Sequence, residues 1–467
     1  MEKIPVVYLE PPLGAVGFPG SPNISYLDAT ASPEVRSWYD TSWKWEDDIR
    51  HKISSKIKEL YPDVEFAEYP IKNVDDLRAF LDHEGNAAGY VVVDLQGPSA
   101  MLSEIIQTGK PIVLLAESLG GGGDYLLDRD LIDRYPVVSI ATRDITSENA
   151  LRKVRYLVAL QNLKSTHALV ITNRDMSAWI NQVSLLTGIK LTLMSGSEFS
   201  DKYFSKVEDA AAKPIADNWI SGAAQFPDKE KQYDEVLKSA RLYIAMQRAL
   251  EDKQANAITI DCLGLRSANS VVLDAWPCLG YAQLYRDGKY VPMCEADLNS
   301  LLVALIGKYL LNVNGSATDP VTDDLNGTVT YYHCYLPTNP INGMNLRYSI
   351  IPSHLGTRYA AVNVEYPIGE KLTAVGFNLG ERSVYVHEST IVGNELSLPA
   401  CGTKVIASAP VRTLARRWGH GWHRVLLLGD HRDAISEFSK LLGLKVINED
   451  SERFQETGVQ LSSSNAI

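Results

Sequence analysis

The chain has 467 residues, which is too long for one ordinary hydrophobic core, so two or three domains are expected. Hydrophobic residues make up 45% and charged residues 22%, a balance typical of a globular protein and not of a disordered one. With 45 basic and 57 acidic side chains the formal net charge is −12, which argues against nucleic acid or an anionic membrane as the main partner and favours a small neutral ligand.

The N-terminal sequence lacks the basic start, long apolar core and cleavage site of a signal peptide, and no apolar run approaches the length of a membrane span. We therefore expect a cytoplasmic protein with no membrane partner. The five cysteines are an odd number and include no CxxC pair, so we expect them to be reduced.

Residues 1–146 are expected to form an N-terminal α/β domain, because short apolar runs alternate with helix-length segments. This pattern is typical of a parallel sheet covered on both faces. The expected elements are, in order, the strand PVVYLE, a helix over 33–60, the strand VEFAEYP, a helix over 74–82, the strand YVVVDLQ, a helix over 99–108, and the strands PIVLLAES and VVSIATRD.

Residues 147–318 are expected to form a second α/β domain by the same pattern. Its expected elements are the helix SENALRKVRYLVALQNL, the strand ALVITN, the helix MSAWINQVSLLTG, the strand IKLTLMS, helical segments over 198–208 and 228–250, and the strand AITIDCLGL. Asp261 lies at the end of this last strand, where parallel sheets place ligands. It fits a pocket-lining role and equally a cap for the next segment.

From Asp319 the sequence consists of Thr-, Val- and Tyr-rich runs broken by Gly, Pro and Asn, which predicts an antiparallel sheet or barrel over 319–467. The segment HRVLLLGDHRDAISEFSKLLGLKVINED then returns to strand, helix and strand. The expected fold class is therefore α/β, with two doubly wound α/β domains followed by a β-barrel-like C-terminal domain.

The stretch from 291 to 334 concentrates chemically useful side chains. Glu295 stands at the start of an apolar helix, an acidic turn with Asp319 follows, and a strand ends near His333. Carboxylates and an imidazole on the ends of rigid elements are what a hard divalent metal needs, with open positions for a substrate's oxygens. A metal site is therefore predicted here.

Each of these residues also fits a structural role. Glu295 would complement a helix dipole, and Asp319, which competes with Asp323 and Asp324, would suit a turn before proline. His333 on a Tyr-rich strand would suit a core position. His420 and His423 are three residues apart, and His423 immediately precedes an apolar strand, which favours it as a ligand.

Four sequence runs follow one another along the chain: IDCLGL, PCLGYAQLYRDGKYVPMCEADLNSLL, TDPVTDDLNGTVTYYHC and GWHRVLLLGDHRDAI. Together they resemble the L-fucose isomerase and L-arabinose isomerase superfamily, in particular its shorter members. The resemblance implies two α/β domains and a β-barrel-like third, with a Mn²⁺-dependent site between the second and third domains. By position, the metal-binding residues would be Glu295, Asp319, His423 and, as in arabinose isomerases, His333.

The expected activity is interconversion of an aldose and a ketose through an enediol, an intramolecular oxidoreductase reaction. It needs a base to move a proton between adjacent carbons and an electrophile to hold both oxygens. Glu295 and Asp319 are the expected catalytic residues, with Mn²⁺ or another divalent metal as cofactor and a small sugar as substrate. The resemblance also implies a homo-oligomer, a trimer or hexamer. A non-catalytic sugar-binding protein of the same fold, or a metal-dependent epimerase or lyase, is the alternative.

Overall fold

A computed structural model describes the chain in segments. These are residues 3–10, 32–33, 43–95, 97, 99–118, 121–227, 229–267, 270–352, 359–395, 401–419 and 421–451. They divide into two compact units: one runs to Asn162 and takes in Glu437–Leu444, and the other comprises Leu163–Ser436 and continues from Lys445. None of the helices in these segments combines the length and apolar composition needed to span a bilayer.

The first unit is built on a five-stranded parallel sheet with strand order β2-β1-β3-β4-β5. Its strands are β1 (Ile4–Leu9), β2 (Phe66–Ile71), β3 (Tyr90–Asp94), β4 (Ile112–Glu117) and β5 (Val137–Thr142). Every residue of β1, β3 and β4 is buried, which explains their continuous apolar sequences. The parallel sheet expected from these runs is confirmed.

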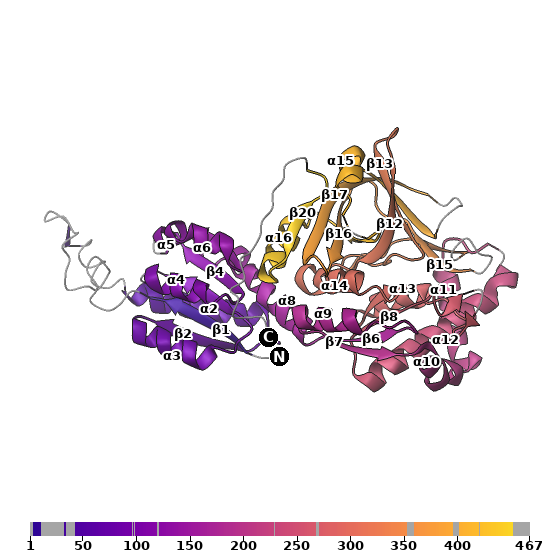
Figure 1. Ribbon diagram of the computed structural model, residues 1–467, viewed down its shortest axis with the longest axis horizontal. Coiled ribbons are helices and arrows are strands. Elements are labelled where there is room, and N and C mark those ends of the chain that lie inside the picture. Colours follow the sequence, from indigo (N-terminus) through magenta and orange to yellow (C-terminus); the bar gives the residue numbers. More distant parts are fainter. Residues whose placement is uncertain are drawn as a thin grey trace. The chain divides into compact units, whose positions relative to one another are not determined.

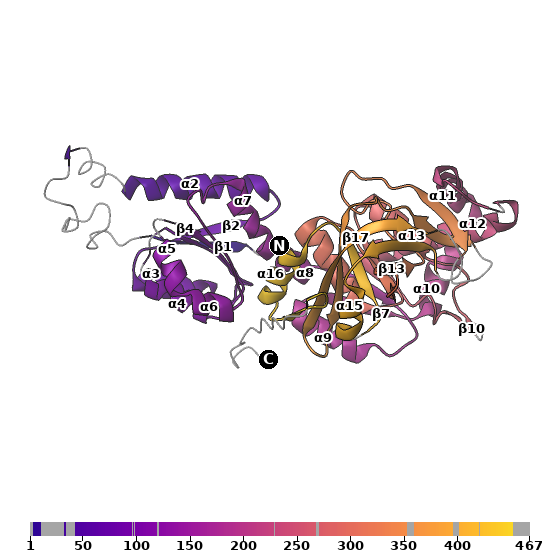
Figure 2. The same ribbon diagram turned by 90° about the horizontal axis from the view of Figure 1, so that it is seen from above.

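Helices cover this sheet on both faces. They are α2 (Trp43–Leu60), α3 (Val74–Glu84), α4 (Ser99–Gln107), α5 (Gly122–Leu127), α6 (Arg129–Arg134) and α7 (Glu148–Leu151), and the next helix, α8 (Arg155–Lys164), crosses the division after Asn162. Figure 2 shows α2 and α7 on one face and α3, α4 and α6 on the other. Of the helix predicted over 33–60, the part from Trp43 is observed, and residues 34–42 lie outside the described segments.

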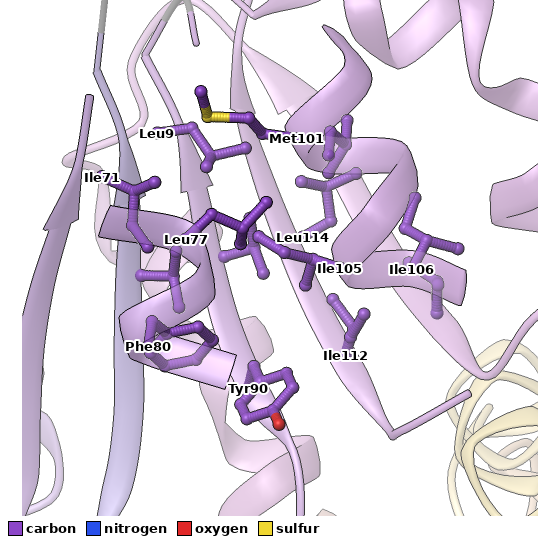
Figure 3. Packing of buried hydrophobic residues seen from close by; sticks show 14 of the residues in the cluster. Leu9, Ile71, Leu77, Phe80, Tyr90, Met101, Ile105, Ile106, Ile112 and Leu114 are labelled. Atoms are coloured by element: carbon purple, nitrogen blue, oxygen red, sulfur yellow. The ribbon is translucent and has the colours of Figure 1, made fainter. Parts of the chain in front are cut away.

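The core of the first unit lies between the sheet and the helices α3 and α4 (Figure 3). Phe80 of α3 packs its ring against that of Tyr90 with centroids 5.1 Å apart, and Ile105 of α4 lies in the same cluster. Burying one such side chain stabilises the fold by about 1.5–3 kcal/mol. The side chain of Asn73 begins α3 by accepting hydrogen bonds from two backbone amides, which fixes where that apolar face starts.

The second unit begins with a four-stranded parallel sheet in the order β11-β8-β6-β7. Its strands are β6 (His167–Ile171), β7 (Lys190–Met194), β8 (Ala257–Ile260) and β11 (Val291–Cys294). The accompanying helices are α9 (Ser177–Thr187), α10 (Gly196–Lys202), α11 (Asp209–Gly222), α12 (Lys229–Lys253), α13 (Cys278–Asp287) and α14 (Leu298–Ile306). The second parallel α/β arrangement is thereby confirmed.

Six strands of the same unit close into a barrel in the order β16-β19-β12-β13-β18-β17, with β17 pairing back to β16. They are β12 (Ser316–Asp323), β13 (Thr328–His333), β16 (Lys371–Asn378), β17 (Ser383–Asn394), β18 (Thr403–Ser408) and β19 (Arg424–Leu428). All neighbouring barrel strands are antiparallel. The barrel predicted from the Thr-, Val- and Tyr-rich runs is confirmed.

The remaining strands are β20 (Lys445–Asn448), which pairs in parallel with β17, and two separate pairs, β9 (Arg266–Ser267) with β10 (Ser270–Val271) and β14 (Tyr348–Pro352) with β15 (Tyr359–Val364). The remaining helices are α15 (Val411–Arg417) and α16 (Arg432–Leu441), and α16 crosses the division before Glu437. Figure 1 shows α13 and α14 between the sheet of the second unit and the barrel. The segment that joins β11 to α14 therefore lies on the side of the sheet that faces the barrel strands. The domain boundaries 1–146, 147–318 and 319–467 remain predictions.

Candidate metal centre

Four side chains singled out from the sequence come together in the second unit. Glu295 follows β11, Asp319 lies on β12, His333 ends β13, and His423 immediately precedes β19. Because β12 pairs with both β13 and β19, the three barrel residues are neighbours. Nε2 of His423 lies 3.3 Å from Oδ1 of Asp319 and 3.6 Å from Oε2 of Glu295. Nε2 of His333 lies 3.5 Å from the other oxygen of Glu295.

The turn that presents Glu295 has an unusual backbone. Glu295 and Ala296 both have positive φ, 62° and 53°, a left-handed conformation that costs residues with a Cβ roughly 1 kcal/mol or more each. Helix α14 begins only after Asp297, whose side chain accepts hydrogen bonds from the amides of Asn299 and Ser300 at 3.0 and 3.2 Å. Asp297 thus takes the capping role, and the carboxylate of Glu295 is directed at the histidines.

Asp297 has a second partner that sets the orientation of His423. Its Oδ2 lies 2.8 Å from Nδ1 of His423, which places the proton of a neutral imidazole on Nδ1 and leaves Nε2 facing Glu295 and Asp319. A carboxylate behind a histidine in this way is the usual support of a metal-binding imidazole. Sequence reasoning did not identify Asp297, since an aspartate before an apolar helix signals only an N-cap.

The carboxylates around His423 also control its charge. Burial alone would lower the pKa of His423, but hydrogen bonds to Asp297 and Asp319, together with the charges of Asp297 and Glu295, raise it to about 10. Burial opposes ionisation of Asp297, yet the hydrogen bond from His423 holds the pKa of its carboxyl below the ordinary value. In the absence of a metal the centre therefore holds an imidazolium among carboxylates, and a bound divalent ion would take the place of the proton on Nε2.

His333 is almost fully buried, with 1% of its surface exposed. Neither ring nitrogen has a hydrogen-bond partner among the described residues, so it is not a core histidine satisfied by its neighbours. A buried polar group left in this state costs roughly 1–3 kcal/mol, unless something else satisfies it. Its ring meets that of His423 edge to face with centroids 5.6 Å apart. A ligand atom from His333 lies within 4.8 Å of ligand atoms of Asp319 and His423, and likewise of Cys294 and Glu295.

These side chains fit a divalent ion. Ligand atoms about 2.1 Å from one ion lie roughly 3.0–3.5 Å from one another in octahedral or tetrahedral geometry. The three separations of 3.3, 3.5 and 3.6 Å are close to that range. Two carboxylates balance the charge of a dication, and mixed oxygen and imidazole donors suit Mn²⁺, Fe²⁺, Co²⁺ or Zn²⁺. Glu295, Asp319, His333 and His423 would hold the ion.

A cavity of about 310 Å³ adjoins the candidate metal centre. Its walls are formed by Glu295, Ala296, Asp297, Leu298, Asn299 and His423 on the metal side, and by Arg174, Met176 and Trp179 from the end of β6 and the start of α9. A small molecule in the cavity would lie against Glu295 and His423. Asp319 and His333 lie deeper, on the barrel strands.

Other residues considered from the sequence serve the structure. Asp261 accepts hydrogen bonds from the Thr172 hydroxyl and the Gly264 amide and pairs with Arg174, so it anchors the loop after β8 and does not line the cavity. Asp323 caps the tip of the β12–β13 hairpin. The expectation that Asp319 lies in an acidic turn is wrong, because β12 continues through it. His420 lies outside the described residues.

No protein-family model matches this chain, and no curated protein sequence matches it. The case for a function therefore rests on the geometry of the candidate metal centre and on the motifs that surround it.

Proposed function

We propose that the protein is a divalent-metal-dependent aldose–ketose isomerase of the L-fucose and L-arabinose isomerase type. The observation that carries the proposal is the convergence of Glu295, Asp319, His333 and His423 beside an open cavity. These four residues come from separate elements, and carboxylates and imidazoles are the donors that such chemistry requires.

Isomerisation moves a hydrogen between two adjacent carbons while negative charge develops on the neighbouring oxygen. Glu295 is suited to move that proton, because it lies on the cavity wall with 21% of its side chain exposed. Asp319, whose side chain is 15% exposed and lies behind the cavity wall, would act as the second carboxylate of the centre. A divalent ion, when bound, would hold the two substrate oxygens and stabilise the developing charge. Asp297 and the buried surroundings keep His423 in one orientation.

The resemblance extends the proposal to the whole molecule. The two parallel-sheet parts would be doubly wound domains of the family fold, and the active form would be a trimer or hexamer in the cytoplasm. Mn²⁺ is the metal we propose, since carboxylate oxygens and imidazoles suit it.

The test is a panel of aldoses incubated with the purified protein, with ketose formation measured before and after chelation and after Mn²⁺ is restored. Ketose should form from at least one pentose or hexose only when the metal is present. Glu295→Gln should abolish turnover while binding of the sugar persists. Glu230→Gln, a matched change at an exposed position of α12, should have no effect. Bound metal without conversion of any aldose would reject the isomerase and favour a sugar-binding protein.

A further inference from the structure

The cavity wall opposite the metal ligands is formed by the carboxyl end of β6 and the first turn of α9. Arg174 lies three residues after β6, and Trp179 lies in the first turn of α9. Ligands of parallel α/β sheets bind at this edge. The side chain of Arg174 is 53% exposed and Trp179 is 43% exposed, although both border the same cavity. On the wall of one cavity, an indole and a guanidinium together offer an apolar face and N–H donors to a ligand.

Arg174 is fixed in position although it is exposed. Its Nη2 donates a hydrogen bond of 2.6 Å to the backbone carbonyl of Glu295, and its Nε lies 2.9 Å from Oδ2 of Asp261. Asp261 is in turn held by the Thr172 hydroxyl. Among the described residues no partner is recorded for Nη1, which leaves two N–H donors for a ligand. The guanidinium is therefore a preorganised donor group that is tied directly to the backbone of the candidate base.

The charges around Arg174 argue against an anionic ligand. The carboxylate of Asp261, with a side chain only 7% exposed, balances the guanidinium. The facing wall carries the carboxylates of Glu295 and Asp297, with Asp319 behind them. A phosphate or carboxylate on the ligand would find no uncompensated positive charge on the Arg174 side. Hydroxyl oxygens can accept from Nη1 without this penalty, and the indole face of Trp179 suits the C–H face of a sugar.

The size of the cavity restricts the ligand further. A volume of about 310 Å³ lies at the lower end of the range for small-molecule sites, which begins at about 300 Å³. One monosaccharide fits such a space, whereas a disaccharide would have to extend out of it.

We propose that Arg174 and Trp179 hold the end of a neutral, unphosphorylated monosaccharide that lies away from the metal ligands. Arg174 donates to its hydroxyls and Trp179 covers its C–H face, so both are substrate-positioning residues. This inference rests on the proposed function for the location of the reacting carbons. It adds two residues that position the sugar and discriminate among sugars.

The experiment uses sugar alcohols, which cannot isomerise, as probes of binding. Pentitols and hexitols are titrated into Mn²⁺-loaded protein by calorimetry, beside the aldonates and sugar phosphates of the same carbon skeletons. Neutral polyols should bind at least tenfold more tightly than their anionic counterparts. Arg174→Gln should weaken polyol binding roughly tenfold, as expected for hydrogen bonds from a charged donor. Trp179→Ala should weaken it to a similar degree, and Arg174→Lys should recover only part of the loss.

Two controls keep the outcomes distinct. Leu185→Ala, at an 80% exposed position of α9 that does not border the cavity, should bind like wild type. Mn²⁺ affinity is measured in every variant, since Arg174 also contacts the backbone of Glu295. Tighter binding of aldonates or phosphates, or unchanged polyol affinity in both Arg174→Gln and Trp179→Ala, overturns the inference. If polyols bind but no aldose is converted, the isomerase proposal is rejected and the sugar-binding role of Arg174 and Trp179 is supported. If Mn²⁺-loaded wild type binds no polyol, both proposals are overturned.

Discussion

Replacing Asp297 by asparagine tests whether its carboxylate sets the tautomer and orientation of His423. In the native centre, Oδ1 of Asp297 accepts from the amides of Asn299 and Ser300, while Oδ2 faces Nδ1 of His423 and the Ser300 hydroxyl. Asparagine keeps the shape and the capping oxygen but places an NH₂ group where Oδ2 was. That group donates, so Nδ1 of His423 would have to accept, and the ring proton would move to Nε2. There it would point at the oxygens of Glu295 and Asp319 and occupy the position of a metal bond.

The magnitude follows from the two ways in which the asparagine can be placed. In the first, the wrong tautomer of His423 should weaken metal affinity by about 10- to 100-fold, or roughly 1.4–2.7 kcal/mol. In the second, the amide turns over and restores the acceptor to His423, but its NH₂ then opposes the backbone amides at the start of α14. The lost cap costs about 1 kcal/mol of stability. Since Asn is itself a good N-cap, the first outcome is expected.

The assay is calorimetric titration of Mn²⁺ into chelator-treated protein, with thermal unfolding of the metal-free forms measured in parallel. Ser300→Ala is the matched control, because it removes the 2.5 Å hydrogen bond from the Ser300 hydroxyl to the same oxygen of Asp297 but keeps the carboxylate behind His423. It should bind Mn²⁺ nearly as wild type does. An Asp297→Asn variant with wild-type affinity and wild-type thermal stability would refute the reasoning, because both placements of the amide would then be without cost.

Further predictions concern protons and the reaction. Because the pKa of His423 is about 10 without metal, each Mn²⁺ should displace one proton from the protein. The apparent Mn²⁺ affinity should therefore rise about tenfold per pH unit between pH 7 and 9. Calorimetry in buffers of different ionisation enthalpy counts the released protons. The same pKa lies above the ordinary value of 6.5, so the contribution of His423 to the stability of the metal-free fold should be complete below about pH 6.5 and be lost as the pH rises through about 10. His423→Gln should flatten that profile in thermal unfolding. His423→Ala should lower Mn²⁺ affinity roughly tenfold or more, with activity partly rescued by excess Mn²⁺. Turnover in deuterated water should place deuterium on the carbon that receives the hydrogen, and product free of deuterium would favour a hydride shift over an enediol.

The strands could be predicted because their signals are local. Short apolar runs identified the parallel strands, and the change to Thr, Val and Tyr identified the barrel. The position of Asp319 was misjudged because an aspartate before proline, followed by more acids, has the composition of a turn. In the structure β12 pairs with β13 from Asp319 to Asp323, whereas its pairing with β19 ends at Thr318. Beyond that point one side of the strand is unpaired, where proline is tolerated, and Asp319 is free to face His423.

Asp297 and Arg174 could not be recognised from the sequence because their decisive partners are distant in the chain. His423 lies 126 residues after Asp297, and the carbonyl that Arg174 contacts, that of Glu295, lies 121 residues after it. Locally, Asp297 is an ordinary helix cap and Arg174 an ordinary loop residue. Arg174 meets Glu295 because β6 and β11 belong to one sheet, and Asp297 meets His423 because the barrel packs against the start of α14.

The barrel interior explains how His423 keeps its place. Arg424, the next residue, is fully buried and pairs with Glu449, while its Nη1 donates a hydrogen bond of 2.9 Å to the carbonyl of His423. Glu449 also accepts from His387, so the buried charges are paired and hydrogen-bonded. Successive residues of a strand point to opposite faces, which directs Arg424 into the barrel and His423 toward the candidate metal centre. Arg424 thus holds the backbone of His423 from inside the barrel, and Asp297 holds its imidazole from the start of α14. A histidine that is fixed at both backbone and ring can bind a metal without first being ordered.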